Sequence, residues 1–167
     1  MRNIEINKTA EITIVRQFNA SRNRVFEAFA DAKSMAEWWG PPAQPITVLK
    51  YEFIPNGMFH YKMEANGNAM YGRFIFGEIR NPELLEFTNA FSDKAGGVIR
   101  APFSAMWPLE VFNRLTFTEQ DGKTTIIMNG YPVNATDEEN EMFMQAQANL
   151  KQGLEGTFMQ LEQYLRK

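Results

Sequence analysis

The chain has 167 residues, of which 44% are hydrophobic and 22% are charged, and its formal net charge is −3. These values are ordinary for one globular domain, and the slightly acidic balance argues against a nucleic-acid-binding protein, which would carry a basic patch. The absence of cysteine excludes disulfides, thiolate nucleophiles and cysteine metal sites.

No segment has the pattern of a targeting or membrane sequence. The first residues lack the apolar core of a signal peptide, and no stretch approaches the roughly 18 consecutive apolar residues of a membrane-spanning helix. We therefore expect a cytoplasmic protein with a single domain over residues 1–167. Residues 1–10 are expected to form a flexible N-terminal extension of that domain.

The first elements in chain order are a strand and two short helices. Residues 11–18 alternate β-favouring and polar side chains, which predicts a strand. Ser21 is a suitable N-cap for the first helix, and Asp31 is a suitable N-cap for a second helix over residues 31–39.

The second helix ends in the most distinctive motif of the chain, Trp38-Trp39-Gly40-Pro41. Gly40 can adopt the left-handed conformation that closes a helix, and Pro41 cannot continue it. Neighbouring helical residues point about 100° apart, so the two indoles cannot share one contact face. We expect one indole to pack in the core and the other to line or gate a cavity. A helix end simply anchored by aromatic residues is the alternative.

Five or six further strands are predicted after this motif. Asp121-Gly122 is a strong hairpin signal between the last two of them. Residues 92–109 contain two glycines and two prolines and predict a long irregular loop. The segments with strand character are 46–54, 57–64, 69–79, 84–91, 110–119 and 123–130.

The last predicted element is a long amphipathic helix. Thr136 and Glu139 have the spacing of a capping box, and apolar residues then recur at helical spacing to the C-terminus. A helix of roughly 28 residues would be about 40 Å long and needs a broad apolar surface, which an antiparallel meander supplies. The space between a curved sheet and such a helix is filled by side chains or holds a ligand.

A set of short motifs occurs in a fixed order along the chain: Phe18-Asn19-Ala20-Ser21, Val25-Phe26, Trp38-Trp39-Gly40-Pro41, Gly57, Glu78-Ile79 with Pro82, Leu85-Glu86-Phe87-Thr88, and Gln152-Gly153-Leu154 with Leu161 and Leu165. In this order the motifs resemble the START-like (SRPBCC, Bet v 1-like) superfamily, and within it the branch of activator of heat-shock-protein-90 ATPase homologues. The resemblance covers residues 10–166. It implies an α+β helix-grip fold, with a curved antiparallel sheet of six to seven strands wrapped around a long C-terminal helix and two short helices after the first strand.

Two departures from the family are visible. Leu154 stands where the family commonly has Trp, after the glycine of the terminal helix. The eukaryotic activators also carry a separate N-terminal domain that docks on the chaperone, and 167 residues are too few to include it. This departure argues against a chaperone partner, which stays an alternative below.

The residue types do not predict catalysis, a metal site or a cofactor. His60 is the single histidine, and it alternates with Phe59 and Tyr61, so we expect it to face solvent. A Ser-His-Asp triad would require it, and no nucleophile-elbow motif is present. No phosphate-binding or dinucleotide-binding fingerprint occurs either.

The 14 Phe and 10 Met residues suit a core, and they equally suit the walls of a cavity. Glu78 and Asn89 are in phase with neighbouring phenylalanines and are candidate polar groups of such a cavity, although Glu78 at a strand end near water is the simpler alternative. Arg100 and Arg114 could supply a counter-charge or lie on the surface. The expected cavity residues are Trp38, Trp39, Phe59, Tyr61, Phe74, Phe76, Glu78, Phe87, Asn89, Trp107, Leu154 and Phe158.

Three functional hypotheses follow. The first is a non-catalytic protein that binds an apolar or aromatic small molecule in an internal cavity. The second is a cyclase, hydratase or hydrolase of the same fold acting on a polyketide-like compound, for which Glu78, Asn89 and Tyr61 are the candidate polar groups. The third is an interaction module that contacts a chaperone, or a second copy of the chain in a homodimer, through a sheet edge or the long loop.

Overall fold

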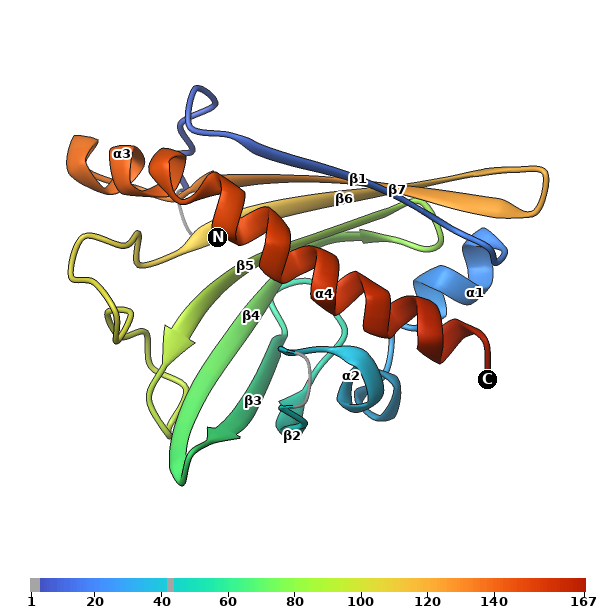
Figure 1. The fold of residues 1–167 in the computed structure, drawn as a ribbon, viewed down its shortest axis with the longest axis horizontal. Coiled ribbons are helices and arrows are strands. Elements are labelled where there is room, and N and C mark those ends of the chain that lie inside the picture. Colours follow the sequence, from blue (N-terminus) through green and yellow to red (C-terminus); the bar gives the residue numbers. More distant parts are fainter. Residues whose placement is uncertain (1–3, 42–43) are drawn as a thin grey trace.

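The computed structural model describes residues 4–41 and 44–167, and within them it contains seven strands and four helices. The strands form one antiparallel sheet in the order β1-β7-β6-β5-β4-β3-β2, and α4 lies across its concave side (Figure 1). The predicted α+β helix-grip architecture is therefore confirmed, with seven strands. The elements are β1 (Ile12–Phe18), α1 (Arg22–Glu27), α2 (Ala32–Trp38), β2 (Ile46–Tyr51), β3 (Met58–Ala65), β4 (Asn68–Arg80), β5 (Leu84–Ser92), β6 (Val111–Gln120), β7 (Lys123–Pro132), α3 (Asp137–Gln145) and α4 (Gln147–Leu165).

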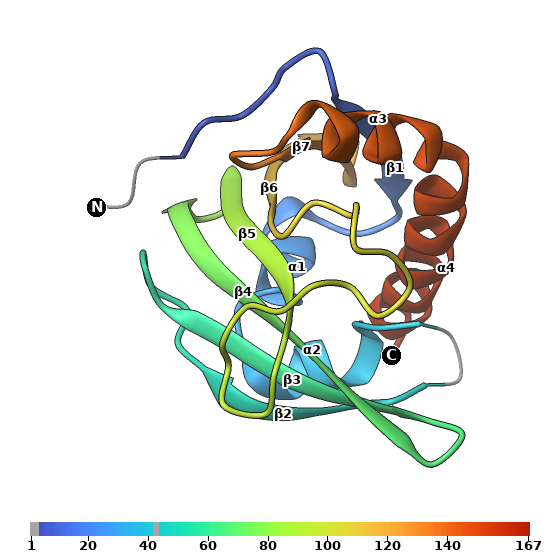
Figure 2. The ribbon, with the colours of Figure 1, turned by 90° about the vertical axis from the view of Figure 1, so that its left-hand side faces the viewer.

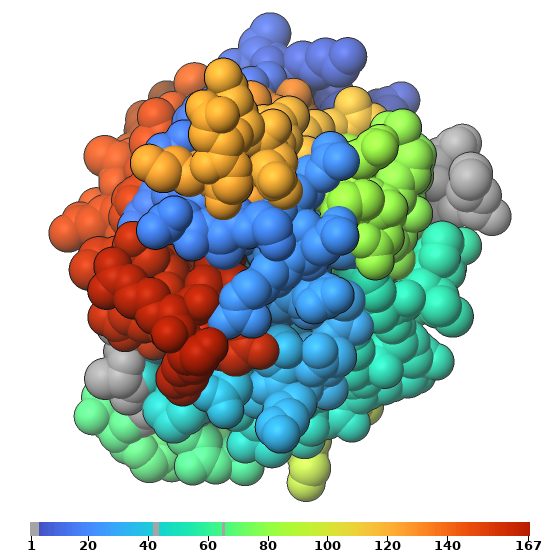
Figure 3. All heavy atoms as spheres, turned by 90° about the vertical axis from the view of Figure 1, so that its right-hand side faces the viewer, coloured from blue at the N-terminus to red at the C-terminus, as the bar shows by residue number. Residues whose placement is uncertain are grey.

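The two short helices carry the chain from one edge of the sheet to the other. Both predicted N-caps are confirmed, since the side chains of Ser21 and Asp31 accept hydrogen bonds from backbone N–H groups in the first turns of α1 and α2. Arg24 of α1 donates to the carbonyl oxygen of Leu165 at 2.8 Å. Figure 3 shows this end of the molecule, where α1, α2 and the end of α4 pack against one another.

The hairpin between β6 and β7 has the predicted turn geometry, and part of the N-terminal segment contacts the sheet. Asp121 and Gly122 both have positive φ, as the predicted hairpin requires. Before β1, Ile6 forms an isolated bridge with Val133, so this part of the predicted extension lies against the end of β7. Residues 1–3 of the extension lie outside the described residues. None of the helices in the described ranges is long and apolar enough to span a membrane.

The single long C-terminal helix that we predicted is divided into two helices. The capping box of Thr136 and Glu139 is confirmed at the start of α3, but α3 and α4 meet at Ala146, whose φ and ψ are −87° and 2°. The break lets α3 and α4 follow different directions over the sheet (Figure 1). The residues at the break, Gln145, Ala146 and Gln147, are not helix-breaking types, and the hydrophobic period continues across them. The sequence therefore does not predict the break.

The Trp-Trp-Gly-Pro motif fixes α2 to the rest of the core. Trp38 is buried, and its indole N–H donates to the carbonyl oxygen of Ala28 at 2.8 Å. Gly40 has φ +107°, and a Cβ there would lie 2.9 Å from Ile46, so this helix end requires glycine. The side chain of Gln160 donates to the Gly40 carbonyl oxygen at 2.7 Å, which joins the end of α2 to α4.

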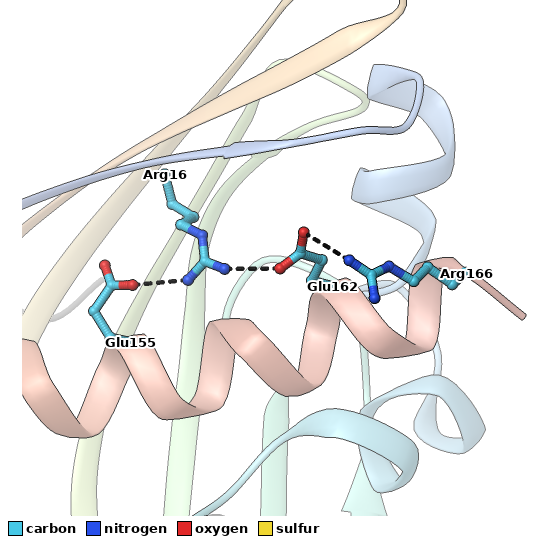
Figure 4. Close-up of polar contacts among 4 residues, drawn as sticks. All are labelled: Arg16, Glu155, Glu162 and Arg166. Atoms are coloured by element: carbon cyan, nitrogen blue, oxygen red, sulfur yellow. Dashed lines mark hydrogen bonds and ion pairs between the residues drawn. The ribbon is translucent and has the colours of Figure 1, made fainter.

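A charged network joins α4 to the edge strand β1 (Figure 4). The guanidinium of Arg16 donates to Glu155 at 2.7 Å and to Glu162 at 3.0 Å, and Glu162 also pairs with Arg166 at 3.3 Å. The Arg16 side chain is only 19% exposed, whereas that of Arg166 is 73% exposed. The inner guanidinium thus makes two charge-assisted hydrogen bonds in a partly desolvated position.

Replacement of Arg16 by methionine is expected to lower the free energy of unfolding by about 1–2 kcal/mol, because the alkyl stem is kept while both charge-assisted bonds are lost. Urea unfolding measures the change. Arg166→Met is the matched control, with an expected loss below about 0.5 kcal/mol for an exposed pair. Equal losses in the two variants would contradict a special role for the inner guanidinium.

Candidate ligand-binding site

A cavity of about 530 Å³ lies between the concave face of the sheet, the α3–α4 junction and the loop that joins β5 to β6. Its volume lies within the range of small-molecule sites. Apart from three asparagines, the side chains that line it are apolar or aromatic. The lining residues are Ile12, Trp39, Phe87, Asn89, Phe91, Phe103, Trp107, Val111, Asn113, Met128, Met142, Phe143, Ala146, Asn149, Leu150 and Leu154.

The two adjacent tryptophans have different places. Trp39 lines the cavity, and its ring meets that of Phe74 edge to face with centroids 5.1 Å apart. Trp38 packs in the core behind it, at 5.7 Å from the Trp39 ring. The side chains diverge because Trp39 is the C-cap of α2 and has extended backbone angles, while Trp38 is the last helical residue.

Five of the predicted cavity residues line the cavity, and six others lie elsewhere in the interior. The lining ones are Trp39, Phe87, Asn89, Trp107 and Leu154. Tyr61 lines a separate pocket of about 60 Å³, to which Asn89 also contributes. The remaining aromatic residues pack on one another in the core and are at most 2% exposed: Trp38, Phe59, Phe74, Phe76 and Phe158.

Glu78 is not a cavity residue. Its side chain is exposed and pairs with Arg80 at 2.7 Å. A β-bulge between Phe76 and Ile79 interrupts the alternation from which the inward direction of Glu78 was inferred. The simpler alternative, a strand-end position near water, is the one that the structure supports.

Arg100 and Arg114 are also engaged outside the cavity. Arg100 pairs with Glu139, and Arg114 pairs with Glu86 at 2.6 Å. Both arginine side chains are about half exposed, at 47% and 52%. Neither of them is a counter-charge for a ligand inside the cavity.

Several lining residues were missed by the sequence interpretation. The strand period of β5 places Phe91 on the face of Phe87 and Asn89, and helical spacing places Phe143 and Leu150 on one stripe, so a signal existed for these three. Phe103 belongs to an irregular loop, for which no period predicts a direction. Its side chain is 64% exposed, so it lies at the mouth of the cavity.

A pair of asparagines forms the polar spot of the inner wall. The Nδ2 of Asn113 donates to the Oδ1 of Asn89 at 2.7 Å and to the carbonyl oxygen of Val111 at 3.1 Å. Asn113 is 4% exposed. Asn89 is partly accessible and lines both the cavity and the smaller pocket.

Tyr61 lies over Gly72 of the neighbouring strand, where a Cβ would come within 2.5 Å of the phenol oxygen. Burial raises the pKa of the Tyr61 phenol above its ordinary value, and a hydrogen bond with the Trp39 side chain offsets part of that rise. The phenol therefore stays protonated at neutral pH. Glu78, Tyr61 and Asn89 do not converge on one point, which removes the polar constellation that the enzyme hypothesis needed.

The loop joining β5 to β6 lies on the side of the molecule that faces the viewer in Figure 2, and side-chain contacts from β3, β4 and α3 hold it in place. At its start, the carbonyl oxygen of Asp93 lies 3.3 Å from Nε2 of His60, and the guanidinium of Arg73 donates to the Gly96 carbonyl oxygen at 3.0 Å. His60 is therefore 6% exposed, and its predicted solvent-facing position is wrong. It does point away from the concave face, but the loop covers that part of the sheet.

The other end of the loop is held to α3 by the ion pair of Arg100 and Glu139. The backbone N–H of Thr136 also donates to Glu139, at 2.9 Å. Burial tends to raise the pKa of Glu139, but the Thr136 hydrogen bond and the Arg100 guanidinium outweigh it and hold this pKa below its ordinary value. The ionised carboxylate thus links the β5–β6 loop to the first turn of α3.

This lowered pKa predicts a pH dependence of stability. The folded state favours the ionised carboxylate, so Glu139 contributes stability above its unfolded pKa of about 4.3, and the contribution is lost as the pH falls through the lower folded pKa. Glu139→Gln keeps a capping-box residue but removes the charge. We expect the stability difference between the wild type and this variant to shrink from about pH 7 to about pH 3 in urea unfolding.

The exposed Glu141→Gln on the same helix controls for the loss of one negative charge. A stability difference for Glu139→Gln that stays constant over this pH range would contradict the role of the ion pair.

Across residues 4–41 and 44–167, no group of three His, Asp or Glu side chains is placed to hold a metal ion.

The curved seven-stranded sheet, the helix across it and the cavity between them define a START-like protein of helix-grip architecture. Residues 19–166 match the family described as Activator of Hsp90 ATPase homolog 1-like protein, so the chain belongs to this family and the resemblance is confirmed. No curated protein gave a significant match.

Solved structures of bacterial proteins share the fold over almost the whole chain. Protein Ms6760 from Mycobacterium smegmatis is 23% identical, with a TM-score of 0.76 and coverage of 99% of this chain and 97% of that one. A protein from Arthrobacter aurescens is 25% identical, with a TM-score of 0.78 and coverage of 98% and 91%. A protein from Staphylococcus epidermidis is 24% identical, with a TM-score of 0.76 and coverage of 99% and 94%.

Proposed function

We propose that this protein binds an apolar or aromatic small molecule in the cavity between the sheet, the α3–α4 junction and the β5–β6 loop. The cavity itself is the observation that carries the proposal. A volume of about 530 Å³ walled by aromatic and aliphatic side chains would release unfavourable hydration when an apolar ligand enters.

The position of the mouth supports the proposal. Phe103 on the loop and Asn149 on α4 both line the cavity and are both exposed, so a ligand can enter between these two elements. The opposite end of the concave space is filled by buried aromatic residues and closed by α1 and α2. A ligand would therefore enter one apolar pocket through this mouth.

The neutral fluorophore N-phenyl-1-naphthylamine tests the proposal, because its emission rises in apolar surroundings. We expect a saturable, one-site increase in its emission, together with quenching of tryptophan fluorescence, because Trp39 and Trp107 line the cavity. Protein unfolded in urea is the control and is expected to give no saturable increase. Absence of saturable binding to the folded protein would refute the proposal.

A further inference from the structure

We propose that the ligand is electrically neutral and carries a hydrogen-bond acceptor, such as a carbonyl oxygen, that the side-chain amide of Asn89 binds. This inference rests on the proposed function and specifies the chemistry of the same cavity. It is carried by the Asn89–Asn113 pair and by the residue types of the cavity wall.

The hydrogen bonds of Asn113 fix which end of Asn89 is available. The Nδ2 of Asn113 meets the carbonyl oxygen of Val111, which can only accept, so the orientation of this amide is set. The same Nδ2 also donates to the Oδ1 of Asn89. The Asn89 oxygen is thus occupied, and its Nδ2, with two N–H donors, is the free end.

No acceptor for the Nδ2 of Asn89 occurs in the part of the chain that the structure describes, and Asn89 lines the cavity. The other amide end of the pair is less available, since the Oδ1 of Asn113 occupies the space beside Gly130, 3.1 Å from where a Cβ would stand. The pair therefore presents a donor, and a ligand oxygen is its chemical complement. A hydrocarbon would cover this donor without satisfying it, which costs binding free energy.

The residue types of the cavity wall indicate that the ligand carries no charge. Among the described lining residues there is no Asp, Glu, Lys, Arg or His. The guanidinium of Arg100, on the loop that covers the cavity, is engaged by Glu139. An ionised carboxylate in the cavity would lose its water without gaining a counter-charge, so ketones, esters and amides fit better than acids.

Three probes of one shape test this inference: 1-acetylpyrene, 1-ethylpyrene and 1-pyrenecarboxylate, titrated into the protein at neutral pH. They differ in the polar group and little in size. We expect the ketone to bind roughly 5- to 10-fold more tightly than the hydrocarbon, as one satisfied hydrogen bond implies. The carboxylate is expected to bind at least about tenfold more weakly than the ketone.

Asn89→Asp removes the donor and keeps an oxygen for Asn113. In this variant the ketone is expected to lose its advantage over the hydrocarbon, while Asn68→Asp, the same change in the exposed β3–β4 hairpin, is expected to keep it. The affinity ratio of the two probes in the wild type tests the inference even if Asn89→Asp does not fold.

The outcomes separate this inference from the proposed function. Saturable binding with equal affinity for ketone and hydrocarbon, or tighter binding of the carboxylate, overturns the inference and leaves the proposed function intact. A ketone advantage that survives in Asn89→Asp also overturns it. If none of the three probes binds saturably, the proposed function falls together with the inference.

Discussion

Leu154→Trp is expected to abolish saturable binding of N-phenyl-1-naphthylamine, or to weaken it by at least about tenfold, while the protein stays folded. Leu154 is half-buried on α4 and lines the cavity. An indole there would project into the space that the ligand needs, and the cavity can accept it without displacing a packed core residue. The family resemblance leads us to expect tryptophan at this position, so we expect the helix-grip fold to tolerate the larger ring.

The control is Leu49→Trp on β2, which makes the same substitution at a side chain that is 47% exposed and outside the cavity lining. Its binding curve and its unfolding midpoint are expected to match those of the wild type. Undiminished binding by a folded Leu154→Trp protein would show that the probe binds elsewhere, and would contradict both the prediction and the proposed site.

The sequence predicts the start of a helix well where one side chain makes a defined hydrogen bond to the helix backbone. Ser21, Asp31 and Thr136 cap helices because their side-chain oxygens reach free N–H groups, and such rules depend on a few adjacent residues. The break at Ala146 has no such signal. It depends on how two helix segments fit a curved sheet, which is a tertiary effect on a locally favourable helix.

The candidate site is harder to predict because the strand period identifies a face and not an empty space. Phe74 and Phe87 face the same side of adjacent strands, and their rings stack 4.1 Å apart, yet only Phe87 lines the cavity. Glu78 shows a second limit, since one bulge reverses the direction of the residues that follow. His60 shows a third, because a distant loop covers an outward-facing side chain.

Trp38→Ala is expected to lower the free energy of unfolding by about 3–5 kcal/mol, the usual cost of removing a large buried aromatic side chain. Trp38 is 1% exposed and packs edge to face against Phe29 with ring centroids 4.8 Å apart. The substitution also leaves the Ala28 carbonyl oxygen without its indole donor. Urea unfolding followed by circular dichroism measures the change without depending on tryptophan emission.

Trp39→Ala is the matched comparison, because the neighbouring indole is half-buried and faces the cavity. Its removal is expected to cost less stability than Trp38→Ala and to weaken N-phenyl-1-naphthylamine binding several-fold, since an aromatic wall is lost. Binding is followed by direct excitation of the probe, so the missing tryptophan does not change the readout. Equal stability losses, or unchanged binding in Trp39→Ala, would contradict this division of the motif into a core ring and a cavity ring.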